Sequence, residues 1–197
     1  MKLKIGGTLI ALILLGIAAA SVFTYNENNP QLPKFSLDSE KAKGWWTSSN
    51  VNIQEMARAS KDYQGIEPID KLPISDLTVH HGSKGKPSED GCFISFSYYD
   101  YKEDLDQKYK EYVDRKSEGE VKTLEPVKKS LKTFEGDKEV TLQRYDYTIE
   151  GQDVLAGYQI GYIALSSGHI RTETVCETPD DLDKSISIID AVQLSEF

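Results

Sequence analysis

Hydrophobic residues follow two different patterns along the chain. The stretch from Ile5 to Phe23 is an uncharged run dominated by Ala, Val, Ile, Leu and Phe. From Cys92 onward, apolar residues instead alternate with polar ones or recur at helical spacing. We therefore expect three parts: an apolar segment at 1–25, a linker rich in Asn and Pro at 26–34, and a globular domain at 35–197.

The apolar run is long enough to cross a membrane. At a helical rise of ~1.5 Å per residue it spans roughly 28 Å, close to the ~30 Å hydrocarbon core of a bilayer. Lys2 and Lys4 precede it, whereas the next base, Lys34, lies well after it. The positive-inside rule then keeps the N-terminus in the cytoplasm and sends the domain across the membrane. We expect residues 5–23 to form a single-pass membrane anchor.

A cleaved signal peptide is the alternative interpretation of the same segment. Ala18, Ala19 and Ala20 precede Ser21 and match an A-x-A cleavage site, so that cleavage after Ala20 would secrete the domain. A buried core helix is a weaker alternative, because such a helix normally shows a polar face. Both membrane interpretations deliver the domain to the extracytoplasmic side.

The strongest signals for secondary structure begin at Cys92. Alternation predicts a strand whose buried face carries four residues: Cys92, Ile94, Phe96 and Tyr98. Asp100 and Glu103 follow at the spacing of a capping box, which predicts a helix start. This helix would end near Gly119 and bury one stripe: Leu105, Tyr109, Tyr112 and Val113.

Four more strands are predicted downstream, separated by turns that contain glycine. They cover residues 121–134, 139–149, 154–166 and 169–176. The third is apolar or small on both faces, so we place it centrally in an antiparallel sheet that is covered on both sides. In the second, the apolar phase shifts between Leu142 and Tyr145, which predicts a β-bulge near Gln143 or Arg144.

The two ends of the domain give further elements. A short helix is expected within residues 49–59, and the alternation of Leu77, Val79 and His81 predicts a strand. Near the C-terminus, Thr178 and Pro179 predict the start of a helix. Its buried stripe would consist of Leu182, Ile186, Ile189 and Val192. The fold class is therefore α+β: an antiparallel β-sheet flanked by helices.

Asp180 and Asp181 fall in the first turn of that last helix. Their negative charges complement the positive end of the helix dipole, so we interpret them as capping residues. Calcium binding is the alternative, but the spaced oxygen ligands and the glycine of a calcium loop are missing. We expect no metal ion and no cofactor.

The chain has two cysteines, Cys92 and Cys176. In an exported domain such a pair usually forms a disulfide, which here would stabilise the fold by roughly 4.5 kcal/mol in the chain-entropy model. Cys92 opens one predicted strand and Cys176 closes another, and bridged Cα atoms lie only ~4.4–6.8 Å apart. We therefore expect the two strands to be antiparallel neighbours. Two separate buried thiols are the alternative.

The order of elements resembles that of a known family. The features that carry the likeness are Phe-Ser-Leu-Asp from Phe35, Gly44-Trp45-Trp46, a strand, a helix, a run of strands, and a closing helix with Ile188-Ile189-Asp190-Ala191-Val192. This pattern resembles the Mog1/PsbP-like fold, although Lys43 stands where that family usually has a proline. The resemblance implies an α/β/α sandwich and a binding or assembly accessory rather than an enzyme. It carries over no functional residues.

Charge excludes one class of partner. The chain has 32 acidic and 23 basic residues, a net charge of −9. Nucleic-acid binding needs clustered Lys and Arg to neutralise phosphates, so we expect no nucleic-acid partner. Two cysteines are also too few for a closed zinc site or a disulfide-rich scaffold.

Catalytic motifs are missing from the sequence. The nucleophile elbow, the zinc-protease helix motif and the Walker loop are all absent. His80 and His81 are adjacent, so in a strand they point to opposite faces and do not chelate together easily. We expect no catalytic residues and a protein that is not an enzyme. A small hydrolase that uses a pair of acidic residues is the alternative function.

Aromatic residues are the one mild excess in the sequence. The adjacent rings of Trp45-Trp46 and of Tyr98-Tyr99 cannot all point into one core if the backbone is extended. Trp46, Tyr99 and Tyr101 are therefore candidates for a binding face, with packing against helices as the alternative. We expect an extracytoplasmic accessory domain that binds a protein or a cell-envelope component. A structural envelope protein without a defined ligand is a further alternative.

Overall fold

The computed structural model describes residues 32–60, 65, 67–81, 91–115, 120–148, 155–177 and 181–196. The predicted anchor and the predicted cleavage site lie outside the described residues. Within the described part, no helix has the length and apolar character needed to cross a bilayer. The chain divides into two units at Pro30, and the second, Gln31–Phe197, contains all of the described structure.

The described part of the chain is α+β, as predicted. Its strands are β1 (Lys34–Leu37), β2 (Trp45–Val51), β3 (Ser75–His81), β4 (Cys92–Tyr99), β5 (Glu120–Thr133), β6 (Gly136–Thr148), β7 (Leu155–Ala164), β8 (His169–Cys176) and β9 (Val192–Ser195). Its helices are α2 (Ile53–Ala59), the 3-10 helix η1 (Ile69–Lys71), α3 (Leu105–Arg115) and α4 (Leu182–Ile189). The predicted strands from residue 77 to residue 176 agree with β3 to β8 to within a few residues.

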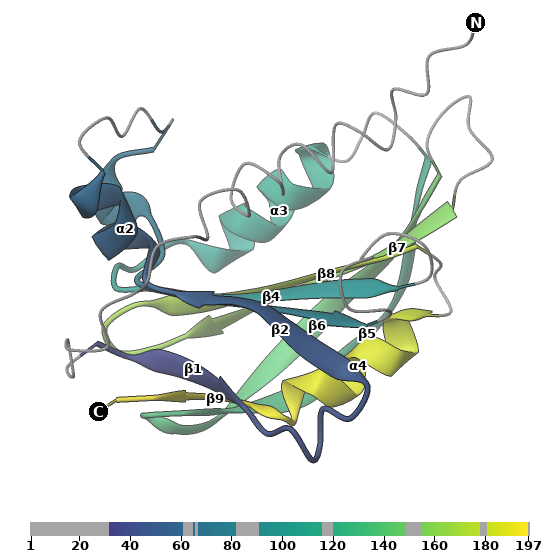
Figure 1. The fold of residues 1–197 in the computed structure, drawn as a ribbon. Coiled ribbons are helices and arrows are strands. Elements are labelled where there is room, and N and C mark those ends of the chain that lie inside the picture. Colours follow the sequence, from purple (N-terminus) through teal and green to yellow (C-terminus); the bar gives the residue numbers. More distant parts are fainter. Residues whose placement is uncertain are drawn as a thin grey trace, which may run out of the picture. The chain divides into compact units, whose positions relative to one another are not determined.

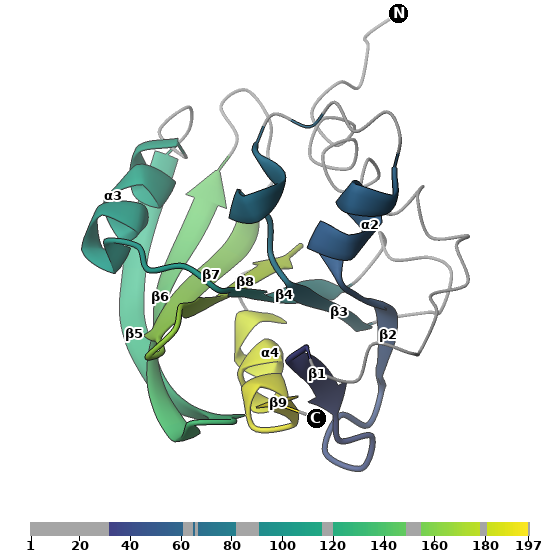
Figure 2. The same ribbon diagram turned by 90° about the vertical axis from the view of Figure 1, so that its left-hand side faces the viewer.

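The strands form one nine-stranded sheet in the order β1-β9-β5-β6-β7-β8-β4-β3-β2. Neighbours are antiparallel, except that β5 and β9 meet in a parallel pairing. β7 is the middle strand, which confirms the central position predicted for residues 154–166. The sheet curls until its two edges meet, and Asn50 Nδ2 on β2 donates a hydrogen bond to the carbonyl oxygen of Phe35 on β1 at 2.9 Å. The sheet is thus close to a barrel (Figures 1 and 2).

The bulge that we predicted on β6 lies on its neighbour. β6 pairs with β7 without interruption from Gln143 on, whereas the register of β5 against β6 shifts between Leu124 and Val127. The apolar phase of β6 changes for another reason. Leu142 faces the main core and Tyr145 faces the opposite side of the sheet, where it packs in a second cluster. A strand that is buried on both sides needs no bulge to change its apolar face.

Two predicted details of the helices are wrong, and a third lies outside the described residues. The cap of α3 is Asp104, whose Oδ1 accepts the backbone N–H of Gln107, and not Asp100. Val192, predicted on the last helix, belongs instead to β9, which pairs with β1. Helix α4 runs from Leu182 to Ile189. The predicted capping residue Asp181 stands at its N-cap position but makes no side-chain capping hydrogen bond, and residues 178–180 lie outside the described residues. Periodicity alone did not separate the last helical turn from a short edge strand, because both bury apolar residues.

The segment at 45–59 holds two elements where we predicted one. Trp45–Val51 forms the edge strand β2, and α2 begins only after Asn52. Asn52 caps this helix, since its side-chain oxygen accepts the N–H of Glu55 at 2.9 Å. The predicted helix is therefore confirmed only in its second half.

The concave side of the sheet holds the main core. Helix α4 lies within the curl of the sheet (Figure 2) and contributes Ile188 and Ile189 to that core. The strands add fully buried residues that include Leu77, Ile94 and Phe96. Helix α3 lies on the opposite, outer side, where its Tyr109 packs against a second cluster of tyrosines. The outer side is therefore only partly covered by helices.

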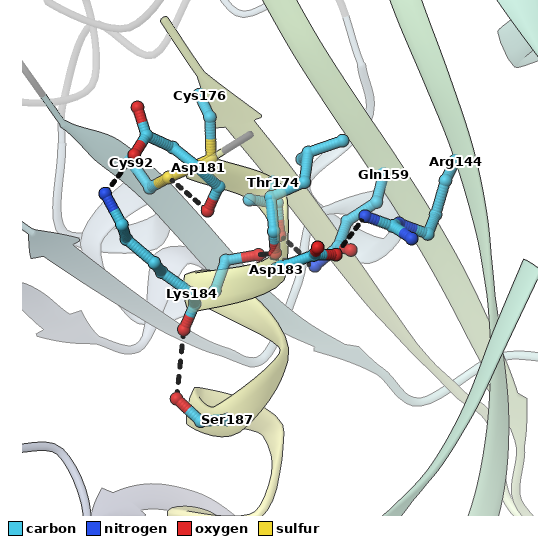
Figure 3. The surroundings of a disulfide bond; sticks show 11 residues. Cys92, Arg144, Gln159, Thr174, Cys176, Asp181, Asp183, Lys184 and Ser187 are labelled. Carbon is cyan, nitrogen blue, oxygen red and sulfur yellow. Dashed lines mark hydrogen bonds and ion pairs between the residues drawn. A yellow bond between two sulfur atoms is a disulfide. The ribbon is translucent and has the colours of Figure 1, made fainter. Parts of the chain in front are cut away.

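The predicted disulfide is confirmed. Cys92 and Cys176 are direct cross-strand partners on β4 and β8, with a Cα–Cα distance of 4.2 Å. Both are buried against Leu182 at the start of α4, and Cys92 Sγ lies 3.3 Å from the carbonyl oxygen of Asp181 (Figure 3). The bridge thus joins two central strands at the point where the final helix begins.

Candidate functional site

Residues on the outer side of the sheet form rows that run across the strands. In the first row, Trp46 on β2 pairs with His80 on β3, and His80 pairs with Phe93 on β4. In the row at the other end of β4, Tyr99 pairs with His169 on β8. We use the name outer strip for the part of this face on β2, β3, β4 and β8. Its residues include Trp46, Asp76, Thr78, His80, Phe93, Ser95, Ser97, Tyr99, His169, Arg171, Glu173 and Val175. We count Tyr101, which follows β4 and packs on the ring of Tyr99, as part of the strip.

One end of the outer strip is an aromatic stack. The ring of Trp46 lies on that of His80, with centroids 4.7 Å apart and nearly parallel planes, and Phe93 meets His80 edge-on at 5.1 Å. All three side chains are half-buried. Trp46 Nε1 and His80 Nδ1 are buried atoms without a hydrogen-bond partner. Burial also lowers the pKa of His80, so its ring is neutral at pH 7.

The middle of the outer strip is polar and carries charges of both signs. Asp76 accepts hydrogen bonds from Ser97 Oγ at 2.7 Å and from Thr78 Oγ1 at 3.3 Å. Burial raises the pKa of Asp76, although these hydroxyls and the nearby Arg171 act in the opposite direction. Arg171 lies 3.4 Å from Glu173 through Nη2 and Oε2, a separation longer than that of a good charged hydrogen bond.

Arg171 is the central base of the outer strip. Its side chain is 35% exposed, yet its Nε is buried and has no hydrogen-bond partner. Burial works against the charge on this guanidinium, but the neighbouring Tyr99, Glu173 and Tyr162 raise the pKa of Arg171 and keep it positive. The five N–H groups of arginine are therefore not used up by the residues around it.

The other end of the outer strip is a second aromatic stack. Tyr99 lies flat on His169 at 4.7 Å, and Tyr101 meets both rings edge-on. His169 Nδ1 lies 2.9 Å from the carbonyl oxygen of Tyr101, which identifies this nitrogen as the donor. Burial lowers the pKa of His169 and raises the pKa of Tyr101 to about 12. At neutral pH, this end carries neutral rings.

Two helices border the outer strip on the same side of the sheet (Figures 1 and 2). Tyr109 on α3 donates its hydroxyl proton to the carbonyl oxygen of Thr141 and accepts the backbone N–H of Tyr162, so α3 is fastened over β6 and β7. On α2, Gln54 Nε2 donates to the carbonyl oxygen of Leu72 at 2.9 Å and approaches Asp100, which ties α2 to the Tyr99 end. Between these helices, the rings of the strip remain partly exposed.

The predicted binding face is brought together only in part. Tyr99 and Tyr101 touch, with ring centroids 5.6 Å apart. Trp46 lies on the same face but at the level of Phe93, six residues away along β4, which at ~3.3 Å per residue is roughly 20 Å. The three residues are therefore two separate stacks at the ends of one strip. None is fully buried.

Arg171 was not among the predicted site residues. The alternation of His169, Arg171 and Glu173 on one face of β8 was visible in the sequence, but it is also typical of a solvated strand face. Only the pairing of β8 with β4 brings Arg171 beside Ser97 and close to Asp76. Arg171 is therefore identified as a candidate site residue only by its neighbours in the tertiary structure.

The remaining polar residues of interest lie on the concave side of the sheet. Gln159 donates hydrogen bonds to Thr174 and to Ser185 of α4, which fixes this helix on β7 and β8. Arg144 on β6 is paired with Asp183 on α4 (Figure 3). These contacts hold the helix in place, and we assign them no ligand.

The described histidines and acidic residues form no metal site. His81 stacks against Trp45 on the concave side, opposite to His80, as predicted for neighbours in a strand. Across the described ranges, no group of three or more His, Cys, Asp or Glu residues is arranged to hold a metal ion. Asp181, considered for calcium, is paired with Lys184.

The sequence matches no family model and no curated protein.

Proposed function

We propose that this chain is an extracytoplasmic accessory domain that binds a protein or a cell-envelope component through its outer strip. The observation that carries the proposal is the composition of this strip: half-exposed Trp46, Tyr99 and Tyr101 around Arg171. Trp, Tyr and Arg are the residue types that contribute most binding energy at interfaces.

Two further arguments support the location. The buried disulfide between Cys92 and Cys176 favours an oxidising compartment, where such bonds persist. The uncharged run at residues 5–23 supports a membrane anchor. The resemblance to the Mog1/PsbP-like fold, whose exported members act as accessories, is consistent with this proposal and stays part of it.

The proposal is tested by capture of partners from intact envelopes. The full chain would be cross-linked in envelopes, purified and compared with a variant carrying Trp46→Ala and Arg171→Gln. We expect partners that are captured by the natural chain and lost with the variant. A control variant with Arg144→Gln, on the concave side, should keep them. Identical captures with all three chains would contradict the proposal. The mass of the mature chain, measured in the same sample, distinguishes a retained anchor from cleavage after Ala20.

A second candidate function is a small hydrolase that uses acidic residues. One observation favours it: Asp76 has a raised pKa and lies on the same exposed strip as Glu173. A carboxyl group whose pKa is raised by burial is a candidate general acid when a second carboxyl group lies nearby. Turnover of a cell-envelope substrate that is abolished by Asp76→Asn, with binding unchanged, would favour the hydrolase over the binding domain.

A further inference from the structure

The unpartnered polar atoms of the outer strip share one property. Trp46 Nε1, His80 Nδ1 and Arg171 Nε are buried and have no hydrogen-bond partner among the described residues. All three are nitrogen atoms, and all three belong to residues on the same face of the sheet. A buried donor without an acceptor costs free energy. The indole nitrogen of Trp46 and the guanidinium nitrogen of Arg171 can only donate, so the acceptors of the strip leave at least these two N–H groups unpaired.

The strip also presents acceptors between these donors. Glu173 is 23% exposed, and its contact with Arg171 is a long one, so both groups keep hydrogen-bonding capacity. Asp76 on β3 is the cross-strand partner of Ser97 on β4, and Ser97 in turn pairs with Arg171 on β8. Donors and acceptors thus occur within two residues of one another along the strands.

These charges limit which ligands the strip can bind. A strongly anionic ligand would gain from Arg171 but would meet Glu173, Asp76 and a chain of net charge −9. A strongly cationic ligand would meet Arg171 itself in the centre of the strip. A neutral ligand whose groups both donate and accept avoids both penalties, and hydroxyl groups have this property.

The two aromatic ends add a requirement of shape. Trp46 and Tyr99 each have one ring face against a histidine, and the rings remain partly exposed. They are separated by roughly 20 Å along β4, counted at ~3.3 Å per residue. A ligand that contacts both must be extended, with flat apolar surfaces at its ends and polar groups between them. Sugar rings in a straight chain combine a flat C–H surface with hydroxyls at the rim.

From these observations we infer that the outer strip binds a neutral, extended glycan. Trp46 and Tyr99 stack on sugar rings at the two ends, while Arg171 donates hydrogen bonds to the ring hydroxyls between them and Glu173 accepts others. This inference rests on the proposed function, because it specifies the cell-envelope component that the same surface takes. A protein partner is the competing outcome of the test.

The test uses the full chain in a detergent without a sugar headgroup, titrated with two neutral tetrasaccharides, chitotetraose and cellotetraose. Binding is followed by calorimetry and by the change in tryptophan fluorescence. We expect saturable binding to at least one of them. Arg171→Gln should weaken it at least tenfold, and Trp46→Phe should weaken it and reduce the fluorescence change. Arg144→Gln, a matched arginine on the concave side, should bind as the natural chain does.

Three results would overturn the inference. The first is no saturable binding to either tetrasaccharide, and the second is equal loss of affinity in Arg144→Gln and Arg171→Gln. The third is tighter binding of the acidic tetrasaccharide of galacturonic acid, which would show that the strip selects anions. Thermal unfolding of each variant, with a cooperative transition as the criterion, shows that lost binding is not lost folding. For Arg171, the conservative Arg171→Lys provides a second variant that keeps the charge.

The failure of this inference is distinguishable from the failure of the proposed function. If both tetrasaccharides fail while the envelope capture still yields a protein lost in the Trp46→Ala and Arg171→Gln variant, the strip is a protein interface and only the glycan assignment falls. If the capture is also unchanged by that variant, the outer strip is not a binding surface and both proposals fall.

Discussion

Consecutive residues of β4 lie in two different environments. Phe96 faces the concave side, where it is fully buried against Phe35, whereas Phe93 and Tyr99 face the outer strip and remain partly exposed. The concave side holds the main apolar core, together with a few polar side chains such as Gln159 and Arg144 that join α4 to the sheet. The outer strip combines partly exposed rings with charges of both signs and three nitrogens that have no hydrogen-bond partner. Unpartnered polar atoms, such as Gln159 Oε1, also occur on the concave side. The comparison indicates that stability comes mainly from the concave side, whereas the outer strip is the surface that we propose for binding.

The largest expected loss of stability comes from truncating a residue on the concave face of β4. Phe96→Ala should destabilise the fold by about 3–5 kcal/mol, because it removes a fully buried ring and leaves a cavity. Phe93→Ala should cost clearly less, since Phe93 is partly exposed. Unfolding in urea measures both free energies. Equal losses for the two variants would break the comparison between the faces.

The second effect concerns the disulfide. Replacing both Cys92 and Cys176 by Ser should lower the free energy of unfolding by roughly 2–4 kcal/mol, the usual range for disulfides, with the chain-entropy value of roughly 4.5 kcal/mol as the upper bound, because the link closes a long loop in the unfolded chain. Urea unfolding of the natural chain with and without a reductant gives an independent value. Unchanged stability in both experiments would contradict the prediction. Binding through the outer strip should persist in the folded variant.

The third effect tests how tightly the concave side is packed around β7. A Cβ atom at Gly161 would lie 2.5 Å from Val140 Cγ2 and 2.9 Å from Leu142 Cδ2. Gly161→Ala should therefore cost about 1–3 kcal/mol through overpacking. Adding Val140→Ala should recover part of that loss, so that the two substitutions are not additive. Strict additivity in thermal or urea unfolding would show that the crowding is absent.

The smallest expected effect is the pH dependence of the outer strip. Burial lowers the pKa of His169 below its usual 6.5, with Tyr99, Tyr101, Tyr162, Arg171 and Lys108 around the ring. The unfolded chain therefore takes up the proton more readily than the folded one. The stabilising contribution is complete above pH 6.5 and is lost as the pH falls through the lower pKa of the folded state.

Urea unfolding at pH 7.5 and at pH 5 measures this loss, which should be smaller in His169→Gln than in the natural chain. His80, whose pKa is lowered in the same direction, contributes to the remainder. Asp76 acts in the opposite direction because its pKa is raised, so Asp76→Asn should make the loss at low pH larger. An identical pH dependence in His169→Gln and the natural chain would contradict the prediction.

Much of the fold was predictable because its strands have strong local patterns. The alternation from Cys92 to Tyr98 placed β4 and its buried face correctly, and the two-sided apolar pattern of residues 154–166 placed β7 in the middle of the sheet. The prediction that Cys92 and Cys176 join neighbouring strands was also correct. Each of these features depends on residues that are close in sequence or on the geometry of one covalent bond.

The wrong predictions occurred where a helix and a strand can have the same local pattern of apolar residues. Val192 suits a helix stripe as well as the edge strand β9, and Trp45–Val51 has no clear alternation because β2 lies at the edge of the sheet. Arg171, at the centre of the candidate site, was not predicted for a different reason. Arg171 is one charged residue among many in the sequence, and only cross-strand pairing gives it its neighbours.

The sequence by itself determined where most strands lie along the chain, which residues of β4 face inward, and the pairing of the two cysteines. Alternation and spacing encode these features within a few residues. Only the tertiary structure decided that the sheet curls until β1 meets β2, and that Trp46, Arg171 and Tyr99 share one face. The physical reason is that sheet curvature and side-chain environment depend on which distant strands pair, and no local pattern specifies that choice.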